Sequence, residues 1–176
     1  MQKSPHSVTD NRVFHSRIAI AGALFLLSAC GESHRKISGS VPALTLKSYS
    51  GQSFALNGPG DVTLIVFWAT WCQPCLMEIP SLMHLHEKYR TRNFRVLAIN
   101  VDDPEGGTVK TISANFGINY PLLVGSEDTM KQFGGVNALP TSFLVDREGK
   151  IKEKLQGVLP EAELERMVLQ VLGPTG

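Results

Sequence analysis

The apolar residues of the chain occur in two patterns, which are continuous runs and positions repeated at helical spacing. Residues 62–69 form an unbroken β-branched and aromatic run, which predicts a strand buried on both faces. After Cys75 the apolar positions recur at helical spacing as far as Tyr89, with Pro80 inside, where a kink is expected. Residues 94–101 are a second buried strand. A strand, a helix and a strand in succession form a βαβ unit, so we expect these two strands to be parallel.

The other segments extend this alternation of strands and helices. Two short alternating pieces at residues 44–46 and 53–56, separated by Ser50-Gly51, predict a β-hairpin before the first core strand. The later patterns predict a helix at 108–116, a strand at 120–124, a helix at 128–133, strands at 141–145 and 150–156, and a helix at 161–172. The chain is therefore predicted to be an α/β domain with helices on both faces of a sheet.

The first thirty residues have the pattern of an export signal. Three basic residues precede an apolar run at residues 18–27, which is shorter than the roughly 20 residues of a membrane-spanning helix. Small residues and then Cys30 follow this run. Residues 1–29 are therefore predicted to be a secretory signal peptide, and the mature protein is expected in an oxidising compartment.

Residues 27–30, Leu-Ser-Ala-Cys, resemble the lipobox of bacterial lipoproteins, in which the cysteine is acylated and begins the mature chain. The resemblance implies lipidation of Cys30 and anchoring at the periplasmic face, and Gly31 favours the outer membrane. Residues 30–41 then predict a flexible tether, and residues 42–174 the folded domain. An uncleaved anchor with an incidental cysteine is the alternative interpretation.

Composition narrows the function classes. Apolar residues make up 43% of the 176 positions and charged residues 19%, ordinary values for a globular protein that exclude a largely disordered chain. Seventeen Lys and Arg against sixteen Asp and Glu give a formal charge of +1, so no nucleic-acid partner is expected. The sequence has no glycine-rich phosphate loop, so no organic cofactor is expected. Its three cysteines are too few for a disulfide scaffold.

Two of the cysteines lie where a buried strand gives way to a helix, in the segment Cys72-Gln73-Pro74-Cys75. At the start of a helix, unpaired N–H groups and the helix dipole stabilise a thiolate, which is the nucleophile of thiol–disulfide exchange. Cys72 is therefore the predicted attacking cysteine, and Cys75, one helical turn later, is placed to resolve the mixed disulfide. Pro74 fits the first helical turn and stiffens the loop between the two sulfurs.

The segment Phe-Trp-Ala-Thr-Trp-Cys-Gln-Pro-Cys at residues 67–75 and the distant Leu-Pro-Thr at residues 139–141 resemble the thioredoxin superfamily. The resemblance extends over about residues 41–172, nearly all of the expected mature chain. It implies a thioredoxin-like three-layer αβα fold with a central mixed sheet. It also implies a redox-active disulfide between Cys72 and Cys75 in place of a cofactor.

The same resemblance assigns residues to the substrate site. In that superfamily the distant proline is cis and faces the disulfide, and the backbone beside it pairs with an extended substrate segment. Carried over to this sequence, Pro140 is the cis proline and Leu139 supplies the substrate-binding backbone. Trp71 and Pro74, which flank the attacking cysteine, are expected in the wall of the same site.

Four features are similar to the exported TlpA/ResA-like branch of the superfamily. They are the lipoprotein-like start, the leading hairpin, an inserted helix–strand segment at about residues 104–126, and the pattern Cys75-x-x-Glu78-x-Pro80. Thioredoxin itself carries a buried acid where this chain has Val66. The resemblance therefore implies that Glu78 handles the proton of the resolving cysteine. A plain solvated helix residue is the alternative for Glu78.

Other protein classes share parts of this pattern. A CxxC pair is half of a zinc site, but His84 and His86 on the same helix diverge, so no metal is expected. An exported copper chaperone would have one more residue between the cysteines and a distal histidine. A peroxiredoxin-type peroxidase would have a threonine shortly before a single peroxidatic cysteine. The cytochrome-maturation branch has Gly-Val-x-Gly-x-Pro-Glu where residues 135–141 read Gly-Val-Asn-Ala-Leu-Pro-Thr.

The sequence is thus interpreted as that of an exported, lipid-anchored thiol–disulfide oxidoreductase that acts on protein thiols and disulfides. The TlpA/ResA resemblance favours a reductant that a membrane thiol carrier reduces again after each turnover. Two alternatives stay open. An oxidising compartment suggests a disulfide-donating oxidant, and the groove around Trp71 and Pro140 would also suit a membrane-tethered module that binds unfolded peptides without redox chemistry.

Overall fold

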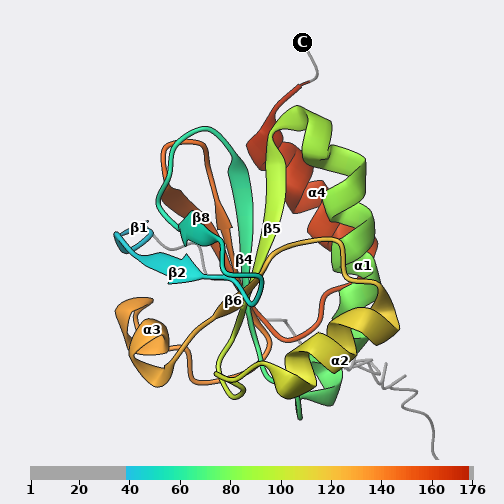
Figure 1. The fold of residues 1–176 in the computed structure, drawn as a ribbon. Coiled ribbons are helices and arrows are strands. Elements are labelled where there is room, and N and C mark those ends of the chain that lie inside the picture. Colours follow the sequence, from blue (N-terminus) through green and yellow to red (C-terminus); the bar gives the residue numbers. More distant parts are fainter. Residues whose placement is uncertain (1–38, 175–176) are drawn as a thin grey trace, which may run out of the picture. The chain divides into compact units, whose positions relative to one another are not determined.

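The computed structural model describes residues 39–174, whose fold is shown in Figure 1. The strands are β1 Gly39–Ser40, β2 Thr45–Lys47, β3 Ser53–Ala55, β4 Val62–Trp68, β5 Phe94–Asn100, β6 Leu122–Val124, β7 Thr141–Val145 and β8 Lys150–Gln156. The helices are α1 Gln73–Tyr89, the short 3-10 helix η1 Arg90–Arg92, α2 Gly107–Phe116, α3 Glu127–Gln132 and α4 Glu161–Leu172. Six strands form one mixed sheet in the order β1-β8-β7-β4-β5-β6, and β2 and β3 form a separate antiparallel hairpin.

Strand β4 is buried along its whole length because it has neighbours on both edges and packed layers on both faces. It runs parallel to β5 and antiparallel to β7. Its side chains alternate between two hydrophobic clusters, with Leu64 and Val66 in one and Ile65 and Phe67 in the other. This double burial explains why the strand reads as a continuous apolar run.

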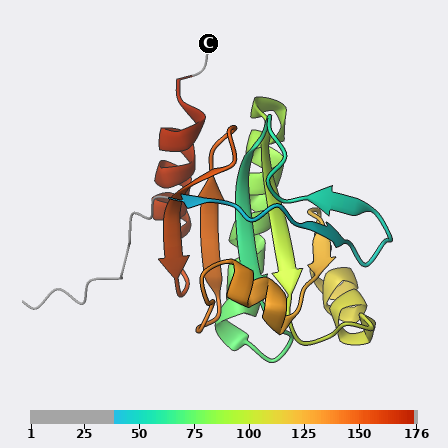
Figure 2. The same ribbon diagram turned by 90° about the vertical axis from the view of Figure 1, so that its left-hand side faces the viewer.

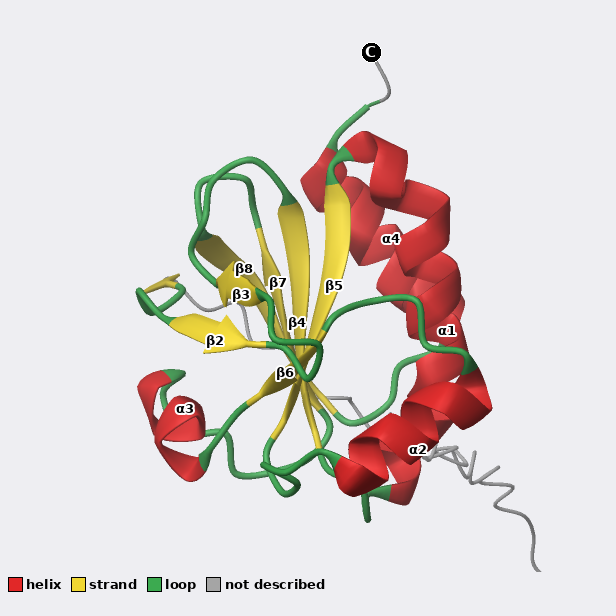
Figure 3. Ribbon diagram, viewed as in Figure 1, coloured by secondary structure: helices red, strands yellow, loops and turns green. Residues whose placement is uncertain are grey.

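The two clusters belong to two different layers. Residues of α1 and α4 cover the first cluster, and Figure 3 shows these helices together on one side of the sheet. Phe133 after α3 and Leu56 after β3 cover the second cluster. Figure 2, viewed from that side, shows α3 and the hairpin in front of the sheet and α1 behind it. The structure is therefore a three-layer αβα domain, as predicted.

The inserted segment at 104–126 extends the sheet at one edge. It contains α2 and β6, and β6 pairs in parallel with β5. The hairpin contacts this edge, since the Tyr49 N–H donates to the Leu122 carbonyl at 3.0 Å. The predicted strand at 120–124 begins two residues late, at Leu122, and Pro121 directly before it has no N–H to donate.

Other expected elements are close to their predicted bounds. The strands at 141–145 and 150–156 and the helix at 161–172 have the predicted bounds. Helix α1 begins immediately after Cys72 and continues as one helix through Pro80. Among the described helices, none is both long and apolar enough to cross a membrane.

The predicted tether at residues 30–41 is wrong at its end. Gly39 and Ser40 pair with the start of β8, and Val41 is buried with its N–H donating to the Gly149 carbonyl at 3.0 Å. The apolar side chain of Val41 and these backbone hydrogen bonds draw the segment into the sheet, so the folded domain begins before residue 42. The predicted signal peptide, Cys30 and the rest of the predicted tether lie outside the described residues.

Candidate active site

The two cysteines of the CxxC segment form a disulfide at the start of α1. Cys72 is the N-cap residue, with an extended backbone, and its sulfur accepts a hydrogen bond from the Cys75 N–H at 3.3 Å. Cys72 and Cys75 are buried, whereas Pro74 in the first turn of the helix is exposed. The helix amino terminus therefore places the sulfur of Cys72 beside the Cys75 N–H, and this position favours the Cys72 thiolate when the disulfide is reduced.

The loop that ends in Pro140 leaves the sheet beside the loop that carries Cys72. Thr141 at the start of β7 pairs with Phe67 near the end of β4, so both loops lie at the same end of these two central strands. The Leu139–Pro140 peptide bond is cis, as the resemblance implies. Pro140 is buried and Leu139 is half-buried. The predicted substrate-site residues are thus brought to one end of the domain.

Two large apolar side chains near the CxxC segment in the sequence are exposed to solvent. Trp71, directly before Cys72, is 69% exposed. Met77, two residues after Cys75, is 74% exposed, and sequence reasoning did not single it out. Its place two residues before the buried Ile79 marks it as a residue of the outer helix face.

Glu78 is buried, so the interpretation of this residue as a plain solvated one is wrong. Its side chain is 3% exposed, and its Oε2 has no hydrogen-bond partner among the described residues. Burial raises the pKa of Glu78 to about 7, because the charged form loses hydration without gaining donors. Glu78 follows Cys75 by three residues on α1, which places both on one face of the helix. A carboxyl in this position can hold or release a proton near neutral pH.

A polar network adjoins the loop that carries Cys72 and was not predicted. The carboxylate of Asp102 accepts hydrogen bonds from the Thr70 N–H at 2.9 Å and from the Thr70 hydroxyl at 2.6 Å. The side chain of Asn100, which is 1% exposed, donates to the same carboxylate at 2.7 Å. The sequence pattern predicts neither a helix nor a strand at residues 102–107. The sequence does carry a signal of the network, a polar Asn at the end of a buried strand followed by two Asp residues.

The two histidines of α1 do not form a metal site. His84 is exposed and pairs with Glu161. The His86 ring is half-buried and accepts a hydrogen bond from the Val96 N–H at 3.1 Å, and burial lowers its pKa. No group of three or more His, Cys, Asp or Glu side chains among residues 39–174 is arranged to hold a metal ion.

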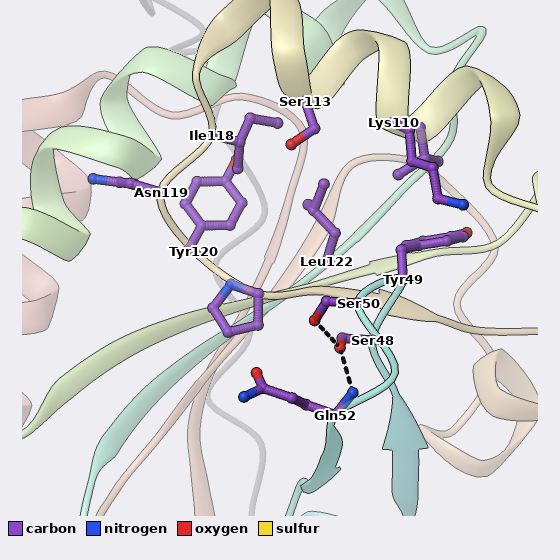
Figure 4. Close-up of a pocket in the computed structure, with 12 residues that line it drawn as sticks. Ser48, Tyr49, Ser50, Gln52, Lys110, Ser113, Ile118, Asn119, Tyr120 and Leu122 are labelled. Carbon is purple, nitrogen blue, oxygen red and sulfur yellow. Dashed lines mark hydrogen bonds between the residues drawn. The ribbon is translucent and has the colours of Figure 1, made fainter.

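A cavity of about 460 Å³ lies between the hairpin turn, α2 and the segment before β6. Figure 4 shows its lining, with Tyr49, Ser48 and Ser50 on one side and Tyr120 and Ile118 on the other. It does not contain the cysteines. Tyr120 also lines a small buried void beneath Cys75, and burial together with the nearby Glu78 carboxyl raises the pKa of its phenol.

Comparisons with known proteins agree with this geometry. The AhpC/TSA family matches residues 37–154, a span that includes both cysteines and Pro140. The chain is 29% identical over 131 residues to the thiol-disulfide oxidoreductase ResA of Geobacillus thermodenitrificans (strain NG80-2), covering 74% of this chain and 75% of that protein.

Solved structures with the same fold include two proteins of Chlorobium tepidum. One, described as a candidate thiol:disulfide interchange protein DsbE, is 31% identical with a TM-score of 0.71, covering 80% of this chain and 100% of that one. The other, from strain TLS and described as a thiol:disulfide interchange protein of the thioredoxin family, is 27% identical with a TM-score of 0.69. It covers 79% of this chain and 99% of that one.

Proposed function

The chain belongs to the AhpC/TSA family and is a thioredoxin-fold thiol–disulfide oxidoreductase, and from that premise we propose that it reduces disulfides of exported proteins. The observation that carries the proposal is the Cys72–Cys75 pair at the start of α1, with the buried Glu78 carboxyl on the same face. The family relationship supports a protein disulfide as substrate. The exposed Trp71 beside the pair offers such a substrate an apolar contact.

In the proposed mechanism the reduced chain begins with a thiolate on Cys72. This thiolate attacks one sulfur of the substrate disulfide, forms a mixed disulfide and releases the other substrate sulfur as a thiolate, which takes up a proton. Glu78, as a carboxylate, then accepts the proton of the Cys75 thiol. The Cys75 thiolate attacks the sulfur of Cys72, closes the Cys72–Cys75 disulfide and releases the second substrate sulfur. Glu78 supplies the proton that this sulfur takes up.

The same proposal includes an electron donor for the disulfide and a cellular location for the chain. A membrane thiol carrier donates two electrons and two protons to the Cys72–Cys75 disulfide after each turnover. Lipid on Cys30 holds the chain at the periplasmic face, with the outer membrane as the favoured location. Labelling of cells with a radioactive fatty acid tests the anchor, because Cys30→Ala is expected to lose the label, and membrane fractionation identifies the membrane.

A reductase assay tests the activity directly. The full chain is mixed with a small disulfide-bonded protein and limiting dithiothreitol, and free substrate thiols are counted over time. Cys72→Ser is expected to abolish catalysed reduction, and Cys75→Ser is expected to accumulate a mixed disulfide with the substrate. Full activity in Cys72→Ser would overturn the mechanism. A Cys72→Ser/Cys75→Ser chain that still replaces the wild type in cells would favour peptide binding without redox chemistry.

A further inference from the structure

We propose that Asn100 and Asp102 are positioning residues for the redox loop, by which we mean residues 69–72. The proposal deepens the redox function proposed above and rests on it. Asp102 holds the loop by its carboxylate, and Asn100 holds Asp102. Neither residue reacts, and both act through the placement of Cys72 at the start of α1.

Two hydrogen bonds join Asp102 to Thr70 of the redox loop, and we call this pair of bonds the grip. Oδ1 of Asp102 accepts from the Thr70 N–H at 2.9 Å, and Oδ2 accepts from the Thr70 hydroxyl at 2.6 Å. Two bonds from one residue to the two oxygens of one carboxylate fix the orientation of Thr70 as well as its position. Thr70 lies two residues before Cys72, and the Cys72 N–H donates to the Ala69 carbonyl at 3.1 Å. The grip therefore acts on the same turn that delivers Cys72 to the helix.

Asn100 orients the gripping carboxylate from inside the protein. It is 1% exposed, and its Nδ2 donates to Oδ1 of Asp102 at 2.7 Å. Its Oδ1 accepts from the backbone N–H groups of Asp102 at 3.2 Å and Asp103 at 2.8 Å. A buried amide bonded on both sides has one favourable orientation, so it fixes the start of the loop that follows β5. Asn100 pairs with Trp68, the last residue of β4 before the redox loop.

The hairpin turn closes the network from the other side. The Tyr49 hydroxyl shares its hydrogen bond between the Asp103 carbonyl at 2.6 Å and Oδ1 of Asn100 at 3.1 Å. The Tyr49 ring lies against Gly106, where an added Cβ would come within 2.3 Å of the ring. Figure 4 shows Tyr49 at the edge of the cavity, beside the hairpin serines. The hairpin is thereby linked through Asn100 to the redox loop.

The reactivity of Cys72 depends on how firmly the redox loop is held. The helix start stabilises a thiolate only while the sulfur stays near its N–H groups, so a loosely held loop raises the thiol pKa and slows attack. Trp71 is 69% exposed, so packing of its own side chain contributes little to holding the loop. The two hydrogen bonds from Thr70 to Asp102 restrain this segment directly beside Trp71.

Asp102→Ala and Asp102→Asn separate the grip from the charge. Alanine removes both acceptors, whereas asparagine keeps an oxygen for the Thr70 N–H and offers an N–H to the Thr70 hydroxyl. The readout is the alkylation rate of Cys72 in the reduced full chain across a range of pH. In Asp102→Ala the rate at neutral pH is expected to fall by about tenfold, with a raised thiol pKa. In Asp102→Asn it is expected to stay within about twofold of wild type.

Two further comparisons control the experiment. Glu105→Ala removes an exposed carboxylate from the same loop, outside the network of Asn100 and Asp102, so it is expected to leave the alkylation profile unchanged. Thr70→Val removes the hydroxyl at constant shape and is expected to shift the profile partway, whereas Thr70→Ser is expected to retain it. An unchanged profile in Asp102→Ala would overturn the proposal. Equal losses in Asp102→Ala and Asp102→Asn would assign the effect to charge and would overturn it as well.

Hydrogen exchange of the Thr70 amide separates this proposal from the redox function. The exchange rate does not depend on activity, and it is expected to rise in Asp102→Ala and stay near wild type in Asp102→Asn. Faster exchange in Asp102→Ala, in a chain that reduces no disulfide, would support the grip while the proposed function fails. Unchanged exchange in a chain that is an active reductase would overturn the grip and leave the function standing.

Discussion

Glu78 and Asp103 are carboxyl groups in neighbouring parts of the fold, yet their surroundings move their pKa values in opposite directions. The pKa of Glu78 rises to about 7 because its side chain is buried and one oxygen lacks a donor. The pKa of Asp103 falls below its ordinary range because backbone N–H groups of Val109 and Gly106 donate to it. The first carboxyl is therefore suited to carry a proton at neutral pH. The second is a permanent acceptor that holds the loop before α2 in place.

The largest expected effect removes the proton carrier. Glu78→Gln keeps the size of the side chain and loses the titratable group. Catalysed reduction at neutral pH is expected to fall by about tenfold to a hundredfold, because Cys75 loses the acceptor for its proton. The pH dependence of the resolving step should flatten at the same time, and rapid-mixing kinetics of the mixed disulfide measure both.

The same helix provides a matched control. Glu87 is exposed and pairs with Arg90 at 2.9 Å, so Glu87→Gln changes a carboxyl of α1 without touching the site. Its kinetics are expected to match the wild type. Equal losses in Glu78→Gln and Glu87→Gln would remove the distinction between the buried carboxyl and the others.

The second effect is a pH dependence of stability. The folded chain keeps the proton of Glu78 up to about pH 7, whereas the unfolded chain loses it near the ordinary value of 4.5. The contribution of Glu78 to the free energy of unfolding is therefore fully present below about pH 4.5 and is lost as pH rises through 7. The loss amounts to about 3 kcal/mol. Urea unfolding at several pH values measures the slope. Glu78→Gln is expected to abolish it, and an identical slope in this variant would contradict the assignment.

Asp103→Asn is expected to give a smaller change with the opposite sign. The pKa of Asp103 is lowered in the folded chain, so its contribution to stability is present above the unfolded value of 3.8 and is lost as pH falls through the folded value. The variant should be less stable than wild type near neutral pH, and the two should converge in acid. Urea midpoints at neutral and acid pH test this, and a difference that grows in acid would contradict it.

The smallest effect concerns a carboxyl with neither burial nor backbone donors. Glu127 on α3 is exposed and pairs with Lys131 one helical turn later. Solvent and salt weaken such pairs, so Glu127→Gln is expected to have an unfolding midpoint indistinguishable from wild type. A clear loss of stability in this variant would show that burial and backbone donors are not what separates the carboxyls of this chain.

The pattern of the sequence predicts most of the fold, because each core strand and helix carries its own period. Strand β4 and helix α4 are examples, since the burial of their side chains follows directly from residue order. The prediction of a tether was wrong at Gly39 and Ser40. These two small residues form a strand only because they pair with β8, more than a hundred residues later in the chain.

Site residues that belong to a sequence motif could be predicted. Contacts between residues far apart in the sequence could not. Cys72 and Cys75 form a disulfide, and the cis Pro140 precedes a strand whose start pairs with the end of β4, the strand before the cysteines. The sequence did not decide whether Glu78 is buried, because burial of a helix residue depends on which other elements pack against that side of the helix. The link from Asp102 to Thr70 spans 32 residues and depends on strand register, so no local pattern indicates it.

The central claim is that Cys72 and Cys75 are a redox-active pair that works as a reductant. The most direct test equilibrates the full chain in glutathione and dithiothreitol buffers and counts free thiols at each poise. The account predicts a single two-electron transition near about −270 mV, a value typical of a reductase with its own electron supply. A transition near about −120 mV would contradict the reducing direction, and the absence of an intramolecular disulfide at every poise would contradict the redox function itself.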